Sequence, residues 1–228
     1  MTAVGYRPPM KTLVLFDIDG TLLRTRGAGR EAMDEAFEAV HGWQKATDGV
    51  HIGGSTDGKI CQDVGHKYGA EIDVEAVKAV YLERVAARLA DRSRVEVCPG
   101  VFELLEALNG RAHVALLTGN WEHGAKAKLG AAGLWESFAW GAYAEDAVDR
   151  NHLLPIARTR AAERGVQHHR VVIIGDTPAD IACARAGAGE VIAVETGFGE
   201  PDELTRCSPD LQVPDLRSAF GRVMNFLG

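Results

Sequence analysis

The chain has 228 residues, of which 46% are hydrophobic and 25% charged, enough for one large globular domain or for one domain that carries a smaller unit. Its formal net charge is −7 and its lysines and arginines form no basic run, which argues against a nucleic-acid partner. Residues 1–10 resemble neither a secretion signal nor a transit peptide, and no apolar segment approaches bilayer-spanning length. We therefore expect a soluble, cytoplasmic protein without a membrane partner.

Four short apolar runs, rich in β-branched residues, predict buried parallel strands at residues 13–16, 114–117, 171–174 and 191–194. Between these runs, residues 101–108 and 153–160 place apolar side chains at helical spacing. Residues 216–227 do the same and predict a closing helix. This alternation of strands and helices predicts an α/β fold with a doubly wound, mostly parallel sheet.

A helical insertion separates the first two predicted strands. One crossover between parallel strands, with the strands themselves, needs about thirty residues, and the stretch between these two strands is far longer. From residue 28 to about residue 91 the pattern is helical, with no convincing strand. We therefore predict two units, an α/β core of residues 1–26 and 95–228 and a helical cap domain of residues 27–94.

Polar residues follow three of the predicted strands: Asp17 and Asp19 after the first, Thr118, Gly119 and Asn120 after the second, and Asp176 and Asp180 after the third. Ligands of open parallel sheets bind beyond the carboxyl ends of the strands. We therefore expect these residues, from distant parts of the sequence, to meet at one rim of the sheet.

Two carboxylates, Asp17 and Asp19, stand one residue apart at the end of a buried strand. In extended backbone they face the same way, so both can address one ligand. A hard divalent cation would relieve their repulsion and keep Asp17 ionised, so that it could attack phosphorus and form an aspartyl phosphate. Asp19 could then act as the general acid and base. The alternative at this stage is an Asp-Gly-Thr turn that is acidic by chance.

Three motifs in one order, FDIDGTLL, LLTGN and IIGDTPADIACARAGA, resemble those of the haloacid-dehalogenase superfamily of hydrolases. The long insertion after the first motif resembles the α-helical cap of phosphoglycolate-phosphatase-like and β-phosphoglucomutase-like members. The resemblance implies a Rossmann-type core, Asp17 as nucleophile and Mg²⁺ ligand, and Asp19 as general acid/base with its backbone carbonyl on the metal. It also implies that Thr118 binds the phosphoryl group and that Asp176 completes the metal site.

Two interpretations compete for Asp180. The sequence Thr177-Pro178-Ala179-Asp180 fits the start of a helix with a capping box, in which Asp180 has a structural task. Members of the superfamily often use this position at the metal, directly or through water. We include Asp180 among the expected metal ligands.

The basic residue of the superfamily pattern is missing in its usual form. Members place a lysine before the helix that precedes the third motif, whereas residues 145–152 contain none. Arg150 fits best, because a guanidinium can hold a carboxylate and a phosphoryl oxygen together. An exposed arginine at a helix start is the alternative for Arg150, and His152 is a reserve candidate for the basic role.

The predicted substrate contacts lie at the strand ends and in a glycine-rich cap loop, residues 51–59. Backbone at glycines can approach a ligand closely. An ordinary interhelical loop, with Ser55 or Thr56 as the N-cap, remains the alternative for the cap loop. The candidate substrate-binding residues are Gly20, Thr21, Gly119, Asn120, Gly54, Ser55 and Thr56.

These features predict a magnesium-dependent phosphatase that hydrolyses a phosphate monoester of a small metabolite, as a monomer or homodimer. Dehalogenation is disfavoured because it needs neither the second acid nor the metal. A sugar-phosphate mutase of the β-phosphoglucomutase type shares the aspartyl phosphate and stays open. From a different class, a non-catalytic phosphoryl acceptor is a further alternative, although it needs neither Asp19 nor a large cap.

Overall fold

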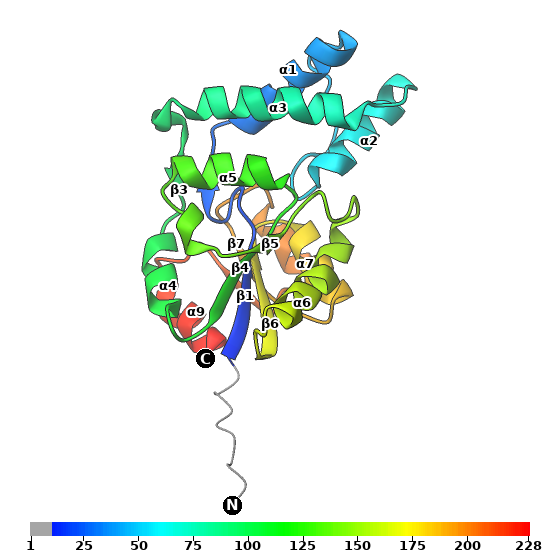
Figure 1. The fold of residues 1–228 in the computed structure, drawn as a ribbon. Coiled ribbons are helices and arrows are strands. Elements are labelled where there is room, and N and C mark those ends of the chain that lie inside the picture. The colour runs from blue at the N-terminus through cyan, green and yellow to red at the C-terminus, as the bar shows by residue number, and fades with distance from the viewer. Residues whose placement is uncertain (1–10) are drawn as a thin grey trace, which may run out of the picture.

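The computed structural model describes residues 11–228, which contain one six-stranded parallel sheet (Figure 1). Its strands stand in the order β5-β4-β1-β6-β7-β8 and all neighbours are parallel. This confirms the predicted α/β class. The strands are β1 (Lys11–Phe16), β4 (His113–Leu117), β5 (Gly141–Ala142), β6 (His168–Gly175), β7 (Glu190–Val194) and β8 (Leu211–Val213).

The chain leaves β1 and β6, which are neighbours, in opposite directions along the sheet. After β1 the next strand of the sheet is β4, on one side, whereas after β6 it is β7, on the other. The connecting loops therefore diverge between β1 and β6. Such a switch point leaves a crevice at the carboxyl ends of the strands, which is where open α/β sheets bind ligands.

Helices cover both faces of the sheet. In β1, Val14 and Phe16 pack with residues of α4 and α9 on one face, whereas Leu13 and Leu15 pack with residues of α6 and α7 on the other. Strands buried on both faces are nearly continuous in apolar residues, as β1 is. The helices of the α/β part are α4 (Val101–Leu108), α5 (Glu122–Ala131), α6 (Leu153–Glu163), α7 (Pro178–Ala186), α8 (Pro201–Arg206) and α9 (Phe220–Leu227), with 3-10 turns η2 (Trp135–Ser137) and η3 (Arg150–His152). A further 3-10 turn, η1 (Arg92–Arg94), lies at the end of the insertion.

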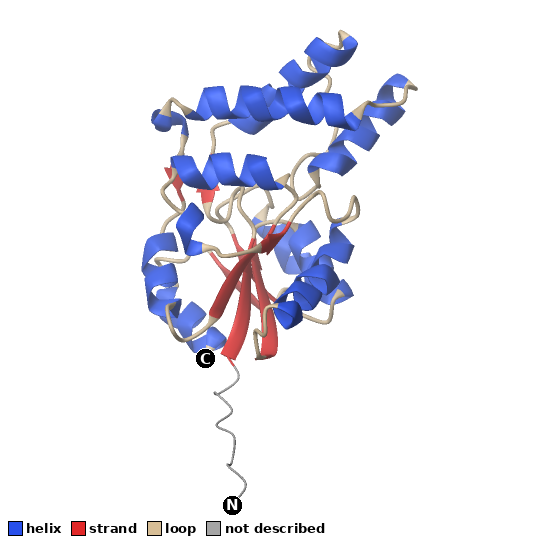
Figure 2. Cartoon of the chain, in the orientation of Figure 1, coloured by secondary structure: helices blue, strands red, loops and turns tan. Residues whose placement is uncertain are grey.

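The insertion contains three helices, α1 (Ala28–His41), α2 (Asp57–Tyr68) and α3 (Val74–Leu89), which lie beyond the carboxyl ends of the strands (Figure 2). They share an apolar cluster that includes Phe37, Val64 and Tyr81, and Trp121 from the α/β part joins it. At the base, β2 (Leu23–Arg24) pairs antiparallel with β3 (Glu96–Val97). The division into core and cap domains at residues 27 and 94 stays a prediction.

Two features of the fold differ from the sequence-based prediction, namely two short strands and the start of the closing helix. The strands β5 and β8 were not predicted, because two or three residues are too few to show a periodicity. The closing helix begins at Phe220 and not at residue 216, because the Asp215 carboxylate accepts hydrogen bonds from the N–H groups of Arg217 and Ser218 and forms a turn there.

Within residues 11–228, no helix combines the length and apolar character needed to cross a bilayer.

Candidate active site

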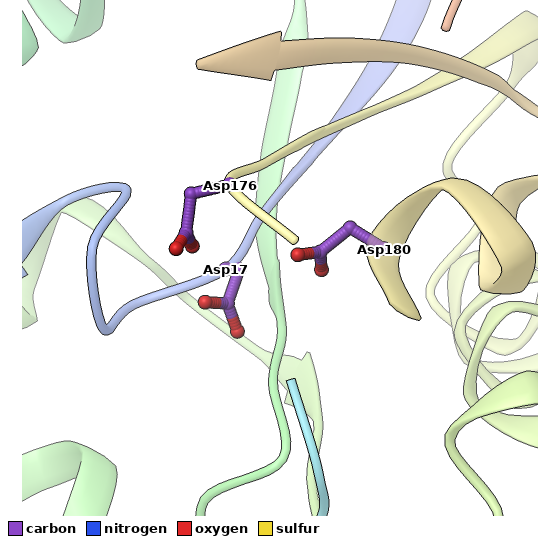
Figure 3. A group of neighbouring side chains, drawn as sticks. All are labelled: Asp17, Asp176 and Asp180. Carbon is purple, nitrogen blue, oxygen red and sulfur yellow. The ribbon is translucent and has the colours of Figure 1, made fainter. Parts of the chain in front are cut away.

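Three buried carboxylates meet at the switch point of the sheet. Asp17 follows β1, Asp176 follows β6, and Asp180 lies in the first turn of α7, with 6%, 0% and 1% of their surface exposed. Figure 3 shows the three side chains pointing toward one another, and their nearest oxygens all lie within 4.8 Å. The backbone N–H of Asp17 donates to the carbonyl of Ile174, 3.0 Å away, which fixes the end of β1 against β6.

Burial and the repulsion of like charges make this cluster electrostatically unfavourable on its own. Burial raises the pKa of Asp17 from 3.8 to about 6, against the opposing effect of the Arg150 guanidinium. The pKa of Asp176 is raised well above its usual value, first by burial and then by the neighbouring Asp180 and Asp17. Buried carboxylate oxygens at this separation are the hard donors that Mg²⁺ and Ca²⁺ prefer. The residues therefore fit a divalent cation.

Neighbouring groups fix the orientation of Asp176. Its Oδ1 accepts from the hydroxyl of Thr21 at 3.0 Å and its Oδ2 from the backbone N–H of Phe198 at 2.7 Å. A Cβ at Gly20, where φ is 87°, or at Gly197 would overlap the Asp176 carboxylate. Glycine at these two positions therefore lets the loop backbone close over the buried acid.

Asp180 also closes the N-terminus of α7, so its capping role is confirmed. Its Oδ2 accepts from the N–H of Thr177 at 3.0 Å and from the Thr177 hydroxyl at 2.7 Å, and the Thr177 Oγ1 accepts from the N–H of Asp180. The other oxygen, Oδ1, contacts Arg150. One carboxylate therefore serves the helix through Oδ2 and faces the acidic cluster through Oδ1, while its place at a metal stays a prediction.

Arg150 lies in η3, just before α6, with 7% of its surface exposed. Its Nη2 donates to Asp17 Oδ1 at 2.9 Å and also to Asp180, and its Nη1 donates to the carbonyl of Gly54 at 3.2 Å. Burial alone would lower the pKa of Arg150, but Asp180 and Asp17 raise it, and the net change is upward. Arg150 is therefore a permanent cation inside the cluster. His152, the reserve candidate, is exposed.

A second basic residue, Lys128, lies beside Asp19 and was missed by the sequence analysis. Its Nζ donates to Asp19 Oδ2 at 2.6 Å and to the side-chain oxygen of Asn120. The Nδ2 of Asn120 donates to the same Asp19 oxygen at 2.8 Å. Lys128 occupies the buried face of α5 together with Gly124, Ala125 and Leu129. A lysine in that stripe of small and apolar residues was the available signal.

These residues border a cavity of about 510 Å³ between the sheet and the insertion. That volume is in the range of small-molecule sites. Its lining from the strand ends includes Asp17, Asp19 and Arg150, and its lining from the insertion includes Asp57 of α2 and Tyr81 of α3. Of the predicted site residues it also contains Gly20, Gly54, Ser55, Gly119 and Asn120.

Three predicted threonines lie outside the cavity wall. Thr118 is fully buried, and its Oγ1 accepts from the Nδ2 of Asn120 at 2.8 Å. The Thr21 hydroxyl is bonded to Asp176, as described above. Thr56 is the N-cap of α2, where its Oγ1 accepts from the N–H of Lys59 at 3.1 Å and donates to the carbonyl of Val148. In this structure all three hydroxyls therefore support other parts of the site.

Comparisons with known proteins agree with this geometry. A family described as haloacid dehalogenase-like hydrolase matches residues 11–187. The fructose-1-phosphate phosphatase YqaB of Escherichia coli is 30% identical over 183 residues, covering 79% of this chain and 95% of that protein. The probable phosphatase IndB of Dickeya dadantii is 26% identical over 219 residues, 93% of each chain. A mutant of CbbY from Rhodobacter sphaeroides, solved in complex with xylulose-(1,5)bisphosphate, superposes with a TM-score of 0.73 at 21% identity, covering 92% of this chain and 96% of that one.

Proposed function

Since this chain belongs to the haloacid dehalogenase-like hydrolase family and is a phosphatase, we propose that it hydrolyses a phosphate monoester of a small metabolite with Mg²⁺, through an aspartyl phosphate on Asp17. The observation that carries this proposal is the buried cluster of Asp17, Asp176 and Asp180, joined by Arg150, of which Asp17 and Arg150 line the cavity. Such a cluster needs positive charge, and it lies where an open α/β sheet binds its ligand.

The charge balance of the cluster supports a divalent ion. If all three carboxylates are ionised, the single guanidinium of Arg150 leaves two negative charges uncompensated. Asp17, Asp176 and Asp180, with the backbone carbonyl of Asp19, would hold Mg²⁺. When bound, the ion supplies positive charge that keeps Asp17 ionised and offsets the charge of the phosphoryl oxygens.

In the first step, a carboxylate oxygen of Asp17 attacks the substrate's phosphorus, and the bond from phosphorus to the alcohol oxygen breaks. The alcohol leaves with the electron pair of that bond and takes a proton from Asp19. In the second step, water attacks the phosphorus of the aspartyl phosphate while Asp19 accepts the water's proton. Phosphate departs and the Asp17 carboxylate is restored, so no other reactant is needed.

The substrate class follows from the cavity and from the relatives. A volume of about 510 Å³ admits a phosphorylated sugar or a short phosphorylated acid. The relative YqaB is named for fructose 1-phosphate, and the CbbY mutant was solved with a sugar bisphosphate. We therefore place sugar phosphates first among the candidates. A mutase would use the same intermediate but return the phosphoryl group to a sugar instead of to water.

Phosphate release from a panel of monoesters tests this function. The panel contains sugar phosphates, phosphoglycolate and nucleotides, each assayed with Mg²⁺ and with a chelator. We expect release that requires Mg²⁺ and is absent in Asp17→Asn. The matched control, Asp202→Asn, changes an exposed aspartate in the first turn of α8 and should keep full activity. Near-normal turnover by Asp17→Asn would rule out the covalent route, and release unaffected by the chelator would rule out the metal.

A further inference from the structure

The ammonium of Lys128 is enclosed at the junction between the insertion and the sheet. Only 5% of its side chain is exposed, although the residue borders the cavity. Helix α1 passes beside it at Gly29, where a Cβ would lie 3.5 Å from the Lys128 Nζ. Burial lowers the pKa of Lys128, but Asp19, Tyr81 and Asp57 raise it and outweigh the burial, so the group is charged. Packing alone does not explain why a charged ammonium is buried at this position.

Two features of helix α5 fix the position of Lys128. Gly124, one turn earlier on the same face, lets Tyr81 pack against the helix, since a Cβ there would lie 3.3 Å from the Tyr81 ring. The start of α5 is tied to the insertion, because the N–H of Trp121 donates to Asp57 Oδ2 at 2.8 Å and the N–H of Asp57 donates to the carbonyl of Gly119 at 2.7 Å. The position of Lys128 is therefore fixed from both sides of the cavity.

Among residues 11–228, the side-chain donors to Asp19 reach a single oxygen, Oδ2. Both of its side-chain partners, Lys128 and Asn120, donate to Oδ2, while a quarter of the side chain stays exposed toward the cavity. We propose that Lys128 is a positioning residue, which fixes the Asp19 carboxylate so that it presents its other oxygen to the leaving group. This inference rests on the proposed function, in which Asp19 exchanges the proton with the alcohol and with water.

The leaving group distinguishes positioning from a merely structural role. The leaving group of an alkyl phosphate is a basic alkoxide, so its departure depends on a proton from Asp19. The leaving group of p-nitrophenyl phosphate is the stable p-nitrophenolate anion, so its departure depends little on that proton. Loss of Lys128 should therefore affect kcat for the two esters unequally. A general loss of structure would lower both values by the same factor.

The experiment compares wild type with Lys128→Met, which keeps the length of the side chain and removes its charge. For glycerol 2-phosphate we expect kcat to fall roughly 10- to 100-fold, and for p-nitrophenyl phosphate by less than about 3-fold. In the double variant with Asp19→Asn, the loss should be no larger than in Asp19→Asn alone, because the two residues act as a unit. The control, Lys126→Met, changes an exposed lysine of the same helix and should leave both rates unchanged.

Several outcomes would overturn the proposal: equal loss on the two esters, no loss on either, or additive losses in the double variant. Lys128→Gln, which keeps a hydrogen-bond donor, repeats the comparison if the methionine variant does not fold. If both neutral variants unfold while Lys126→Met stays folded, Lys128 is structural and the proposal is wrong. The wild-type assay separates this result from the proposed function, since Mg²⁺-dependent phosphate release there stands whatever Lys128 does.

Discussion

The cavity has two acid–base pairs, Asp17 with Arg150 and Asp19 with Lys128, and they differ in how they are enclosed. Asp17 and Arg150 are both buried in the α/β part, among two further carboxylates. Asp19 is partly exposed, and its partner Lys128 contacts the insertion. Both acids border the cavity, but the proposed nucleophile is almost fully buried among its partners, whereas the acid proposed to move protons keeps a quarter of its side chain exposed.

Removing the cation from the buried pair should have the largest effect. In Arg150→Met, Asp17 and Asp180 lose their shared partner, and breaking a buried pair in this way costs about 3–5 kcal/mol of the free energy of unfolding. We also expect kcat to fall about 100- to 1,000-fold. Urea denaturation in chelator and phosphate-release kinetics measure the two effects. The exposed Arg206→Met is the control, and an unaffected kcat in Arg150→Met would assign the basic role to another residue.

Removing the acid from the partly exposed pair should produce a selective loss. In Asp19→Asn the side chain keeps its shape but cannot supply a proton, so turnover of an alkyl phosphate should fall about 100-fold or more. Turnover of p-nitrophenyl phosphate should fall by less than about 10-fold. Steady-state kinetics on the two esters measure the ratio. If both esters lost activity equally, Asp19 would not be the general acid.

Protonation of the insertion's buried acid should change stability with pH. Burial raises the pKa of Asp57 from 3.8 to about 7, although Lys128 opposes the rise. A folded-state pKa above the unfolded value means that the folded protein binds the proton more tightly, so this contribution is complete below pH 3.8 and is lost as the pH rises through about 7.

Urea denaturation of wild type and of Asp57→Asn, both in chelator, tests this pH dependence. The free energy of unfolding of wild type, relative to the variant, should decrease by roughly 1 kcal/mol per pH unit between pH 4 and 7. A difference that does not change with pH, or that increases, would contradict the raised pKa.

The smallest expected effect concerns the cap that orients Asp180. Thr177→Ala removes the N-cap hydroxyl of α7, which should lower the free energy of unfolding by about 1 kcal/mol. Thermal denaturation of this variant, beside the exposed Thr205→Ala as a control, measures it. A loss no larger than that of the control would mean that the Asp180 backbone and carboxylate hold the turn without the hydroxyl.

The residues around the cavity also differ in how far the sequence predicts their positions. Asp17 and Asp176 directly follow apolar strands, and parallel strands bring their carboxyl ends to one edge, so their meeting follows from local pattern and topology. Lys128 stands in the middle of a helix and Asp57 at the start of another, and only tertiary packing brings them to Asp19 and to Trp121. Residue type and spacing along the chain do not predict which residues of different helices this packing brings together.

The hydrogen-bond partners of the threonines are a second feature that the sequence pattern does not predict. Thr21 and Thr56 were predicted substrate contacts, Thr21 beside a strand end and Thr56 in the glycine-rich cap loop, with an N-cap as the alternative for Thr56, and substrate binding by both stays a prediction. In the structure, Thr21 bonds Asp176 and Thr56 caps α2. Which of several available partners a short hydroxyl reaches depends on backbone geometry within an ångström, which the sequence pattern does not give.

Rapid acid quench with a ³²P-labelled substrate detects the proposed covalent step on Asp17 itself. In the presence of Mg²⁺, wild type should carry an acid-stable label that hydroxylamine removes and that maps to the peptide containing Asp17. Asp17→Asn should carry none, and Asp19→Asn should retain its label longer, because no base activates the water. Turnover without any labelled enzyme, or a label that persists in Asp17→Asn, would rule out an aspartyl phosphate on Asp17.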